Sequence, residues 1–288
     1  MLSIGHIVNP FSPRSSSDLA TAQPIVLETM RVAKEFSAGR IEVELLSAQY
    51  PEDRHVVPSG FRMTENLTRS VLDISLLQPP RRLPLIADIL QRLHAESSAK
   101  MVVYTNMDIG LQPFFYDWVG EIAALGIDAF VVNRRTIHRQ YETFKQIPRM
   151  WAEEGKRHPG WDCFVFPRAI IPELKLGHIC IGAPMVGRVL AANLLCNSQR
   201  FKLFDDKHVT FHIGEDRAWR GAPLRGYYDH NRAEAIPILG KLLEQHGPFL
   251  EQPHRSLFDI RAHVEPSGFG RVVYASRRML RRVRARLR

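Results

Sequence analysis

The sequence predicts an α/β fold with a mostly parallel sheet, because strand-like and helix-like segments alternate along its first half. Short apolar segments predict strands at Leu2–Val8, Arg40–Ala48, Met101–Tyr104 and Ile127–Asn133. Segments with apolar residues at helical spacing predict helices at Ser15–Phe36, Leu83–His94 and Phe114–Leu125. Parallel neighbours need crossover connections, and the helices between the strands supply them.

The second half also mixes strands and helices, with a change in character near residue 220. The predicted elements are a helix around Tyr141–Glu154, strands at Cys163–Pro167 and His178–Gly182, a helix at Val186–Cys196 and a strand at Val209–Ile213. Beyond Gly221 the pattern is mostly helical. We therefore expect one domain over residues 1–220 and a helical C-terminal extension over residues 221–288.

Composition is that of a soluble globular protein, with 45% hydrophobic and 24% charged residues in a chain of 288. No apolar run approaches the roughly 18 residues that a membrane-spanning helix needs. The first residues, MLSIGHIVNPF, lack the basic start of a signal peptide. Cys163, Cys180 and Cys196 lie in apolar surroundings without metal-site spacing, which favours buried reduced thiols. We expect a cytoplasmic protein.

The net charge of +9 comes from the C-terminal tail, since residues 271–288 hold eight arginines and no acid. Subtracting these eight from the 39 lysines and arginines leaves 31 bases against 30 acids in the body. A nucleic-acid-binding face is therefore not indicated. Val272, Leu280, Val283 and Leu287 recur at helical spacing, which predicts a basic amphipathic helix that lies on the inner, anionic membrane surface. A solvated terminus is the alternative.

The richest segment is Lys100–Trp118, where a buried strand ends in the polar residues Thr105-Asn106-Met107-Asp108 and Pro113 opens a helix. In open α/β sheets, ligands bind at the carboxyl ends of strands. Asn106 and Asp108 are two residues apart, so both side chains can point the same way. They form either a grip for a nucleotide diphosphate with Mg²⁺ or Mn²⁺, or a polar turn that caps the helix.

Together these segments resemble the GT-A-fold glycosyltransferases, which use nucleotide-diphosphate sugars. The resemblance covers roughly residues 1–220 and includes the first strand's turn Asn9-Pro10-Phe11, the Asn106-Met107-Asp108 segment in the place of a D-x-D motif, and Gly160–Phe166. It implies a GT-A-like (Rossmann-like) sheet flanked by helices. It also implies that Asp108 and His212 hold a divalent cation, Mn²⁺ or Mg²⁺, and that Asn9, Asp53 and Asn106 contact the nucleotide.

Two departures from the family pattern affect the expected mechanism. Asn106 replaces the first acid of D-x-D, which weakens the case for a metal. The helix that begins with a catalytic acid pair in inverting members corresponds to residues 184–196, which contain no acid. Asp162 is therefore the leading candidate for the general base, followed by Glu215 and Asp216.

Arginines and a glycine-containing turn complete the expected site. Guanidinium groups match phosphate oxygens, so we expect a charge clamp from Arg81, Arg82, Arg134 and Arg135. Each of these arginines is alternatively solvated or paired with a surface acid. His158 and Gly160 are expected in a loop entering the Cys163–Pro167 strand, where glycine allows a close approach of the backbone to a ligand. A capped turn is the structural alternative.

Other phosphate-binding and hydrolytic motifs are absent from the sequence. There is no G-x-x-x-x-G-K-[ST], no strand-linked G-x-G-x-x-G and no G-x-S-x-G. We expect a glycosyltransferase that moves a sugar from a nucleotide-diphosphate donor to an acceptor hydroxyl in glycan or glycolipid assembly. The alternative is a non-catalytic sugar-nucleotide or glycan binding protein that retains the fold.

Overall fold

The computed structural model describes residues 1–14, 17–214, 224–247 and 256–258. The chain divides into two compact units, Met1–Phe249 and Leu250–Arg288. In the second unit, the described part is the 3₁₀ turn η8 (Ser256–Phe258). The predicted tail helix at residues 271–288 lies outside the described residues, so the fold below is that of the first unit.

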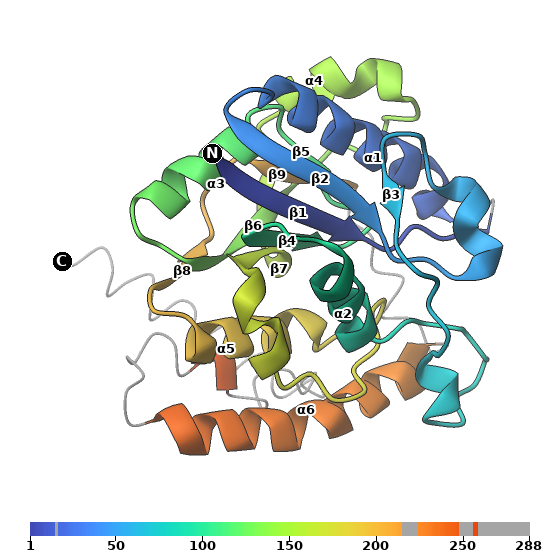
Figure 1. Cartoon of the computed structure of the whole chain (residues 1–288). Helices are drawn as coiled ribbons and strands as arrows, with labels where there is room; N and C mark the ends of the chain where they lie inside the picture. The colour runs from blue at the N-terminus through green and yellow to red at the C-terminus, as the bar shows by residue number, and fades with distance from the viewer. Residues whose placement is uncertain (15–16, 215–223, 248–255, 259–288) are drawn as a thin grey trace, which may run out of the picture. The chain divides into compact units, whose positions relative to one another are not determined.

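A single mixed sheet forms the centre of the first unit (Figure 1). Its strands run in the order β3-β2-β1-β4-β7-β6-β9-β5, and β8 pairs with β6. The bounds are β1 Leu2–Val8, β2 Ile41–Ser47, β3 Arg62–Met63, β4 Met101–Thr105, β5 Gly110–Leu111, β6 Ala129–Ile137, β7 Lys156–Pro167, β8 Phe201–Phe204 and β9 Thr210–Ile213.

Most strand pairs in the sheet are parallel, which confirms the predicted fold class. β1 pairs in parallel with β2 and β4, β2 with β3, and β6 with β8 and β9. The antiparallel pairs are β7 with β4, β7 with β6, and β5 with β9. β7 is the one strand that separates the two parallel groups in the described sheet, because it runs against both neighbours.

Helices cover both faces of the sheet (Figure 1). Their bounds are α1 Asp18–Phe36, α2 Ile86–Glu96, α3 Phe115–Ala124, α4 Ile147–Ala152, α5 Val186–Asn197 and α6 Arg225–His246. The 3₁₀ turns are η1 Pro51–Val56, η2 Val71–Asp73, η3 Phe144–Gln146 and η4 Arg168–Glu173. α1 and α3 pack on one face, α2 and α5 pack on the other, and α6 packs against α5.

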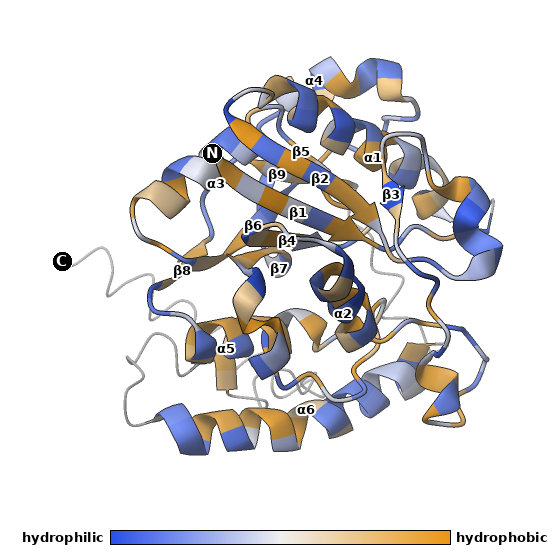
Figure 2. Cartoon of the chain, in the orientation of Figure 1, coloured by the Kyte–Doolittle hydropathy of each residue, from blue (hydrophilic) through white to orange (hydrophobic). Residues whose placement is uncertain are grey.

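The main core lies between the sheet and the α1–α3 layer. Val103, Phe115, Phe130 and Val165 are fully buried there. In Figure 2, β1 and β2 are banded in hydrophobic and hydrophilic colours, whereas β4 is mostly hydrophobic and is buried along its length. Strands that are buried on both faces have this continuous apolar pattern.

Three predicted elements differ from the structure. β7 begins at Lys156, so His158 and Gly160 lie within a strand and the predicted loop is wrong. The predicted strand His178–Gly182 is reduced to one bridge, Leu85 with Cys180, because the Cys180 backbone bonds to the side chain of Asn231 instead of to a strand. The predicted Tyr141–Glu154 helix is shortened to η3 and α4, with Pro148 in the first turn of α4.

α6 belongs to the first compact unit, although the sequence placed it in an extension starting at residue 221. Its buried residues are Tyr227, Asn231, Ala235, Leu239 and Leu242. Tyr227 is part of a second, smaller core with Val71, Leu85 and Cys180. α6 is therefore integrated with the fold through its buried face.

Candidate functional site

Five polar side chains from four neighbouring strands meet at the carboxyl end of β4. Asn106 and Asp108 follow β4, Arg134 lies on β6, Asp162 on β7 and His212 on β9. Thr105 of β4 pairs with Cys163 of antiparallel β7, so Asn106, which follows Thr105, and Asp162, which precedes Cys163, fall at the same edge. The Asn106 N–H donates to the Asp162 carbonyl oxygen at 3.2 Å. We call these five residues the strand-end cluster.

Asp162 is the centre of one half of this cluster. Its Oδ2 accepts from Arg134 Nη1 at 2.8 Å, and its Oδ1 accepts from Asn106 Nδ2 at 3.1 Å. Asp162 is 8% exposed and Arg134 9%. Burial raises the pKa of Asp162, and the Arg134 charge offsets only part of that rise. Asp162 is therefore a carboxyl with an elevated pKa and no saturating set of backbone donors.

Asp108 and His212 form the other half, with Asp108 Oδ2 3.1 Å from His212 Nε2. The sequence predicted that these two side chains converge, and the structure confirms it. His212 Nδ1 lies 2.7 Å from the Gly214 carbonyl oxygen, which can only accept, so we assign the proton to Nδ1. Nε2 faces the Asp108 carboxylate. That contact becomes favourable when a proton or a cation occupies Nε2.

Electrostatics favour the ionised form of Asp108. Burial by itself raises the pKa of Asp108, but the hydrogen bond and charge of His212, with the charge of Arg134, outweigh it and the net pKa is lowered. Asp108 Oδ1 and Arg134 Nε are buried and have no hydrogen-bond partner in the described parts of the chain. Buried polar atoms normally have partners, so these two atoms are available to a ligand.

The residues of this half fit a divalent cation. A carboxylate and an imidazole are ligands that Mn²⁺ accepts, and the Gly214 carbonyl bonded to Nδ1 fixes the orientation of the His212 ring. Within the described part of the chain, no group of three or more His, Cys, Asp or Glu could hold a metal alone. Mg²⁺ and Mn²⁺ sites that use substrate phosphates need only one or two protein ligands. The role of Asp108 and His212 as metal ligands remains a prediction.

A buried polar group that sequence reasoning did not connect to the site lies directly behind β4. His6 binds the Thr105 hydroxyl through Nε2 at 3.0 Å and the Tyr116 hydroxyl through Nδ1 at 2.7 Å. Burial lowers the pKa of His6 to about 3, so the ring is neutral at physiological pH. This group fixes the last residue of β4, and therefore the starting point of the segment that carries Asn106 and Asp108.

Asn9 and Asp53 connect the ends of β1 and β2 and have backbone partners. Asn9 Nδ2 donates to the Ala48 carbonyl at 2.6 Å, and Asp53 Oδ1 accepts from the Ser12 N–H at 2.8 Å. Both are buried. These bonds give each residue a structural role, and their predicted contact with a nucleotide is untested.

The predicted arginines separate into different environments. Arg135 donates to the carbonyl oxygens of Glu154 and Gly155 and to the Glu154 carboxylate, so its guanidinium lies apart from Asp162 although its neighbour Arg134 binds Asp162. Arg81 is exposed. Arg82 donates to Glu52 Oε1 at 2.6 Å and lies 4.0 Å from the centre of the Tyr50 ring.

His158 and Gly160 lie beside Asp162 on β7. The Gly160 N–H donates to His158 Nδ1 at 2.9 Å. A Cβ at position 160 would lie 2.8 Å from the His158 ring and 3.3 Å from Asp162 Oδ2. Glycine therefore avoids crowding His158 and the Asp162 carboxylate at this position. Glu215 and Asp216, the other candidate bases, lie outside the described residues.

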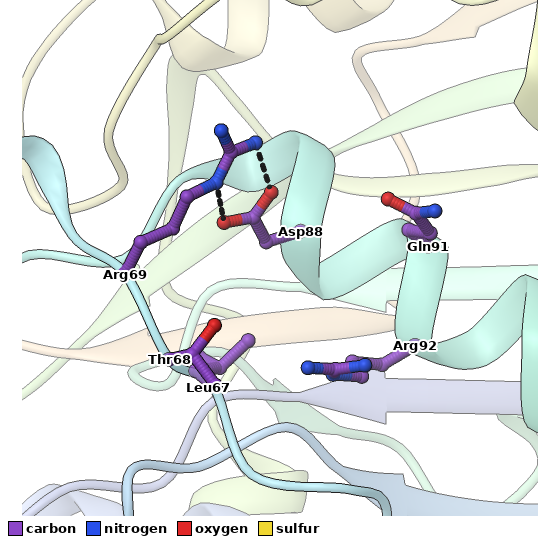
Figure 3. A pocket seen from close by; sticks show the side chains of 6 residues that line it. All are labelled: Leu67, Thr68, Arg69, Asp88, Gln91 and Arg92. Atoms are coloured by element: carbon purple, nitrogen blue, oxygen red, sulfur yellow. Dashed lines mark hydrogen bonds and ion pairs between the residues drawn. The ribbon is translucent and has the colours of Figure 1, made fainter. Parts of the chain in front are cut away.

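A pocket elsewhere on the molecule was not indicated by the sequence (Figure 3). It is lined by Leu67, Thr68, Arg69, Asp88, Gln91 and Arg92. Arg69 forms a two-pronged ion pair with Asp88, at 2.8 and 2.7 Å. Arg92 is bound to Glu65 and to the Asn66 carbonyl. Because both guanidinium groups already have partners, this pocket is a weaker candidate than the strand-end cluster.

Comparison with known proteins is informative only for the fold. No family model matches the chain, and no curated protein matches it. Crystal structures of S. aureus TarS 1–349 are similar to it. The complex with UDP-GlcNAc is 10% identical, with 88% of this chain and 69% of that chain covered and a TM-score of 0.51. TarS 1–349 without this ligand is 9% identical, with 93% and 74% covered and a TM-score of 0.50.

The chain has the GT-A glycosyltransferase fold. The resemblance predicted from sequence is thus confirmed at the level of the fold. Glucosyl-3-phosphoglycerate synthase from Mycobacterium tuberculosis, in complex with Mn²⁺, UDP and glucosyl-3-phosphoglycerate, aligns at a TM-score of 0.46, with 15% identity over 83% of this chain and 80% of that chain. Within the GT-A fold, the strand-end cluster lies where open α/β sheets bind ligands, at the carboxyl ends of strands.

Proposed function

We propose that this chain is a glycosyltransferase that moves a sugar from a nucleotide-diphosphate sugar to an acceptor hydroxyl in glycan or glycolipid assembly. The observation that carries the proposal is the strand-end cluster, in which two carboxylates, a guanidinium and an imidazole meet in a GT-A fold. Two of its buried polar atoms, Asp108 Oδ1 and Arg134 Nε, have no hydrogen-bond partner among the described residues. A diphosphate with its cation has the complementary charges.

Donor binding in this proposal depends on charge neutralisation. Asp108 and His212 would hold Mn²⁺ or Mg²⁺, and a bound cation would stabilise the negative charge of the leaving diphosphate. Arg134 donates hydrogen bonds to the diphosphate through a planar fork that matches phosphate oxygens. Asn106, two residues before Asp108, offers its amide to the ribose. Asn9 and Asp53 contribute to the nucleotide side of the site.

Asp162 is the proposed general base. Transfer with inversion requires a carboxylate that removes the proton of the acceptor hydroxyl. A raised pKa makes Asp162 a stronger base than an exposed aspartate. When a diphosphate draws Arg134 away from Asp162, the carboxylate loses its compensating charge and its basicity increases further.

A thermal-shift panel of nucleotide sugars, with and without Mn²⁺, tests the proposal. A donor present at about 100 times its Kd should stabilise the protein by roughly 2.7 kcal/mol. Asp108→Ala should remove the effect of Mn²⁺ while the circular dichroism spectrum is retained. Arg92→Met, in the separate pocket, is the matched control and should keep the donor shift. A panel without any shift contradicts the proposal.

The second candidate is a non-catalytic sugar-nucleotide or glycan binding protein. Asn106 in place of an acid and the absence of any acid in the first turn of α5 favour it. The two functions are separated by measuring nucleoside diphosphate release in the presence of acceptor glycans and lipid-linked sugars. Donor binding without any turnover supports the binding protein.

Attachment to a membrane surface is a separate part of the proposal. No helix among the described residues has the length and apolarity needed to cross a bilayer. The predicted attachment rests on the arginines of residues 271–288, which lie outside the described residues. We propose peripheral binding to the anionic inner leaflet of the membrane through this tail.

A further inference from the structure

One face of α6 is bonded to two separate loops of the first unit. Tyr227 and Asn231 are four residues apart, so they lie on the same side of the helix, and both side chains are fully buried. Tyr227 bonds to the loop at residues 79–82, and Asn231 bonds to the loop at residues 180–184. α6 therefore fixes the backbone of both loops.

The Tyr227 contact fixes the segment that carries Arg81 and Arg82. The Tyr227 hydroxyl accepts from the Arg81 N–H at 2.5 Å and donates to the Pro79 carbonyl at 2.8 Å. The phenol uses its donor and one acceptor site here, so it holds the turn from both sides. Among the described residues, the hydroxyl has one further contact, with the Arg81 carbonyl oxygen at 3.3 Å.

The two arginines of this turn differ in whether their guanidinium groups have interaction partners. Arg82 is paired with Glu52 and stacked on Tyr50, which places the turn against η1 and near Asp53. The Arg81 guanidinium makes no hydrogen bond or ion pair with any described residue. The Arg81 guanidinium is exposed and its backbone is held in place. Binding an anion therefore costs less conformational entropy than it would for an arginine on a mobile backbone.

Asn231 makes the corresponding contact on the other loop. Its Oδ1 accepts from the Cys180 N–H at 2.9 Å, and its Nδ2 donates to the carbonyls of Cys180 at 2.8 Å and Pro184 at 3.0 Å. This loop leads into α5, whose Gly187 would bring a Cβ within 2.7 Å of the Trp161 carbonyl. Through Asn231, α6 therefore also supports the start of α5, which packs beside Trp161, the residue before Asp162.

We propose that Tyr227 is a positioning residue for donor binding, which acts by holding Arg81 where its guanidinium binds the donor diphosphate. The proposal rests on the proposed function, because it assigns a role in binding the nucleotide-diphosphate donor. Tyr227 itself does not touch the donor. Loss of the Tyr227 hydroxyl releases the turn at residues 79–82. The contribution of Arg81 to donor binding is then reduced by the conformational entropy lost when the turn is ordered again.

A double-mutant cycle with UDP as the probe tests this coupling by calorimetry. Tyr227→Phe should raise the Kd for UDP by about tenfold, the loss expected for one well-placed hydrogen bond. Arg81→Ala should raise it at least as much. The double variant should bind UDP no more weakly than Arg81→Ala, because Tyr227 has no effect once Arg81 is gone. Tyr141→Phe, which removes a hydroxyl bonded to Glu153 at 2.8 Å, is the matched control and should leave the Kd unchanged.

Hydrogen exchange of the Arg81 amide provides the second measurement. Tyr227→Phe should speed exchange at Arg81 and leave the amides of β4 protected. If the losses of UDP affinity in the two single variants add up in the double variant, or if Tyr227→Phe leaves the Kd unchanged, the positioning role of Tyr227 is overturned. The proposed function is unaffected by either result as long as the wild-type protein binds UDP. Wild-type protein that ignores UDP contradicts both. Unchanged Arg81 exchange in a folded Tyr227→Phe variant overturns the positioning role whatever the ligand result.

Discussion

At the scale of single residues, Asp162 is the residue that we propose as the general base. It is buried, has an elevated pKa and is bonded to Asn106 and Arg134. Asp162→Asn keeps the size of the side chain and removes its ability to take a proton. We expect kcat to fall by roughly 10²–10⁴-fold, the usual contribution of general base catalysis, with the Kd for the donor little changed.

Initial rates with saturating donor, together with calorimetric titration of UDP, measure these two quantities separately. Near-normal turnover in Asp162→Asn removes this residue from the role of base. Glu215 and Asp216 would then be the next acids to replace.

The ion pair between Arg134 and Asp162 predicts a change in pH dependence. The guanidinium favours the ionised carboxylate, so its removal in Arg134→Met should raise the pKa of Asp162 further. A base is lost when pH falls through its pKa, and the acidic limb of the kcat/KM profile should therefore move to higher pH. The control is Arg135→Met, because Arg135 binds Glu154 and not Asp162.

The position of that limb is read from kcat/KM between pH 4 and 9. A limb that stays in place in Arg134→Met, or moves to lower pH, contradicts the assignment of Asp162 as the group that titrates.

The sequence predicted some of these residue contacts and missed others for a physical reason. The resemblance placed Asp108 with His212, 104 positions apart, and they are in contact. The match between guanidinium groups and phosphate oxygens made Arg134 and Arg135 equal candidates. Consecutive strand residues point to opposite faces, and the register of β6 shifts between Val132 and Arg135. Which arginine faces Asp162 is decided by this local shift, which the sequence pattern does not encode.

At the scale of elements, the short strand β5 controls the distance between Asp108 and His212. β5 pairs with β9 through Gly110 opposite Phe211, the residue before His212. A Cβ at position 110 would lie 2.5 Å from the Phe211 ring. Glycine is therefore needed for β5 to approach β9 closely.

Gly110→Ala should destabilise the protein by about 1–3 kcal/mol, the typical cost of overpacking a well-packed core. It should also weaken Mn²⁺-dependent binding of UDP, because Phe211 must move next to His212. Urea denaturation and calorimetry measure the two effects. Gly240→Ala on α6 is the control: nothing lies within 4 Å of its Cβ position, and alanine in a helix is favourable by up to about 1 kcal/mol.

Gly110→Ala with unchanged stability contradicts the packing argument. Strands β3 and β5 could not be predicted, because two residues carry no readable period and such strands are defined only by their partners. The longer elements α1, α2, α5, β1 and β2 were predicted within a few residues, since their apolar spacing is sustained over several turns or several alternations.

At the scale of the whole molecule, the alternation of elements identified the fold, but it did not identify the direction of β7. A buried strand has the same apolar pattern whether it is parallel or antiparallel to its neighbours. The reversal brings Asp162, the proposed general base, to the carboxyl end of β4. The position of α6 was also not predictable, since its bonds through Tyr227 and Asn231 are made to backbone groups of distant loops.

The uneven charge of the chain predicts salt-dependent binding to membranes. Basic residues near an anionic leaflet contribute on the order of 1 kcal/mol each, and eight arginines lie in residues 271–288. The full chain should sediment with anionic liposomes at low salt, and a chain truncated after Gly270 should not. Turnover with a soluble acceptor should be similar in both. Full-length protein that stays in the supernatant contradicts the attachment.

The central claim is that the strand-end cluster binds the diphosphate of a nucleotide-sugar donor. A crystal structure of the protein with UDP and Mn²⁺ tests it most directly. The account predicts diphosphate oxygens within hydrogen-bonding distance of Arg134, with the metal bound by Asp108 and His212 at about 2.0–2.6 Å. A nucleotide bound instead in the pocket between Arg69 and Arg92, or no diphosphate beside Arg134 at saturating UDP, would contradict it.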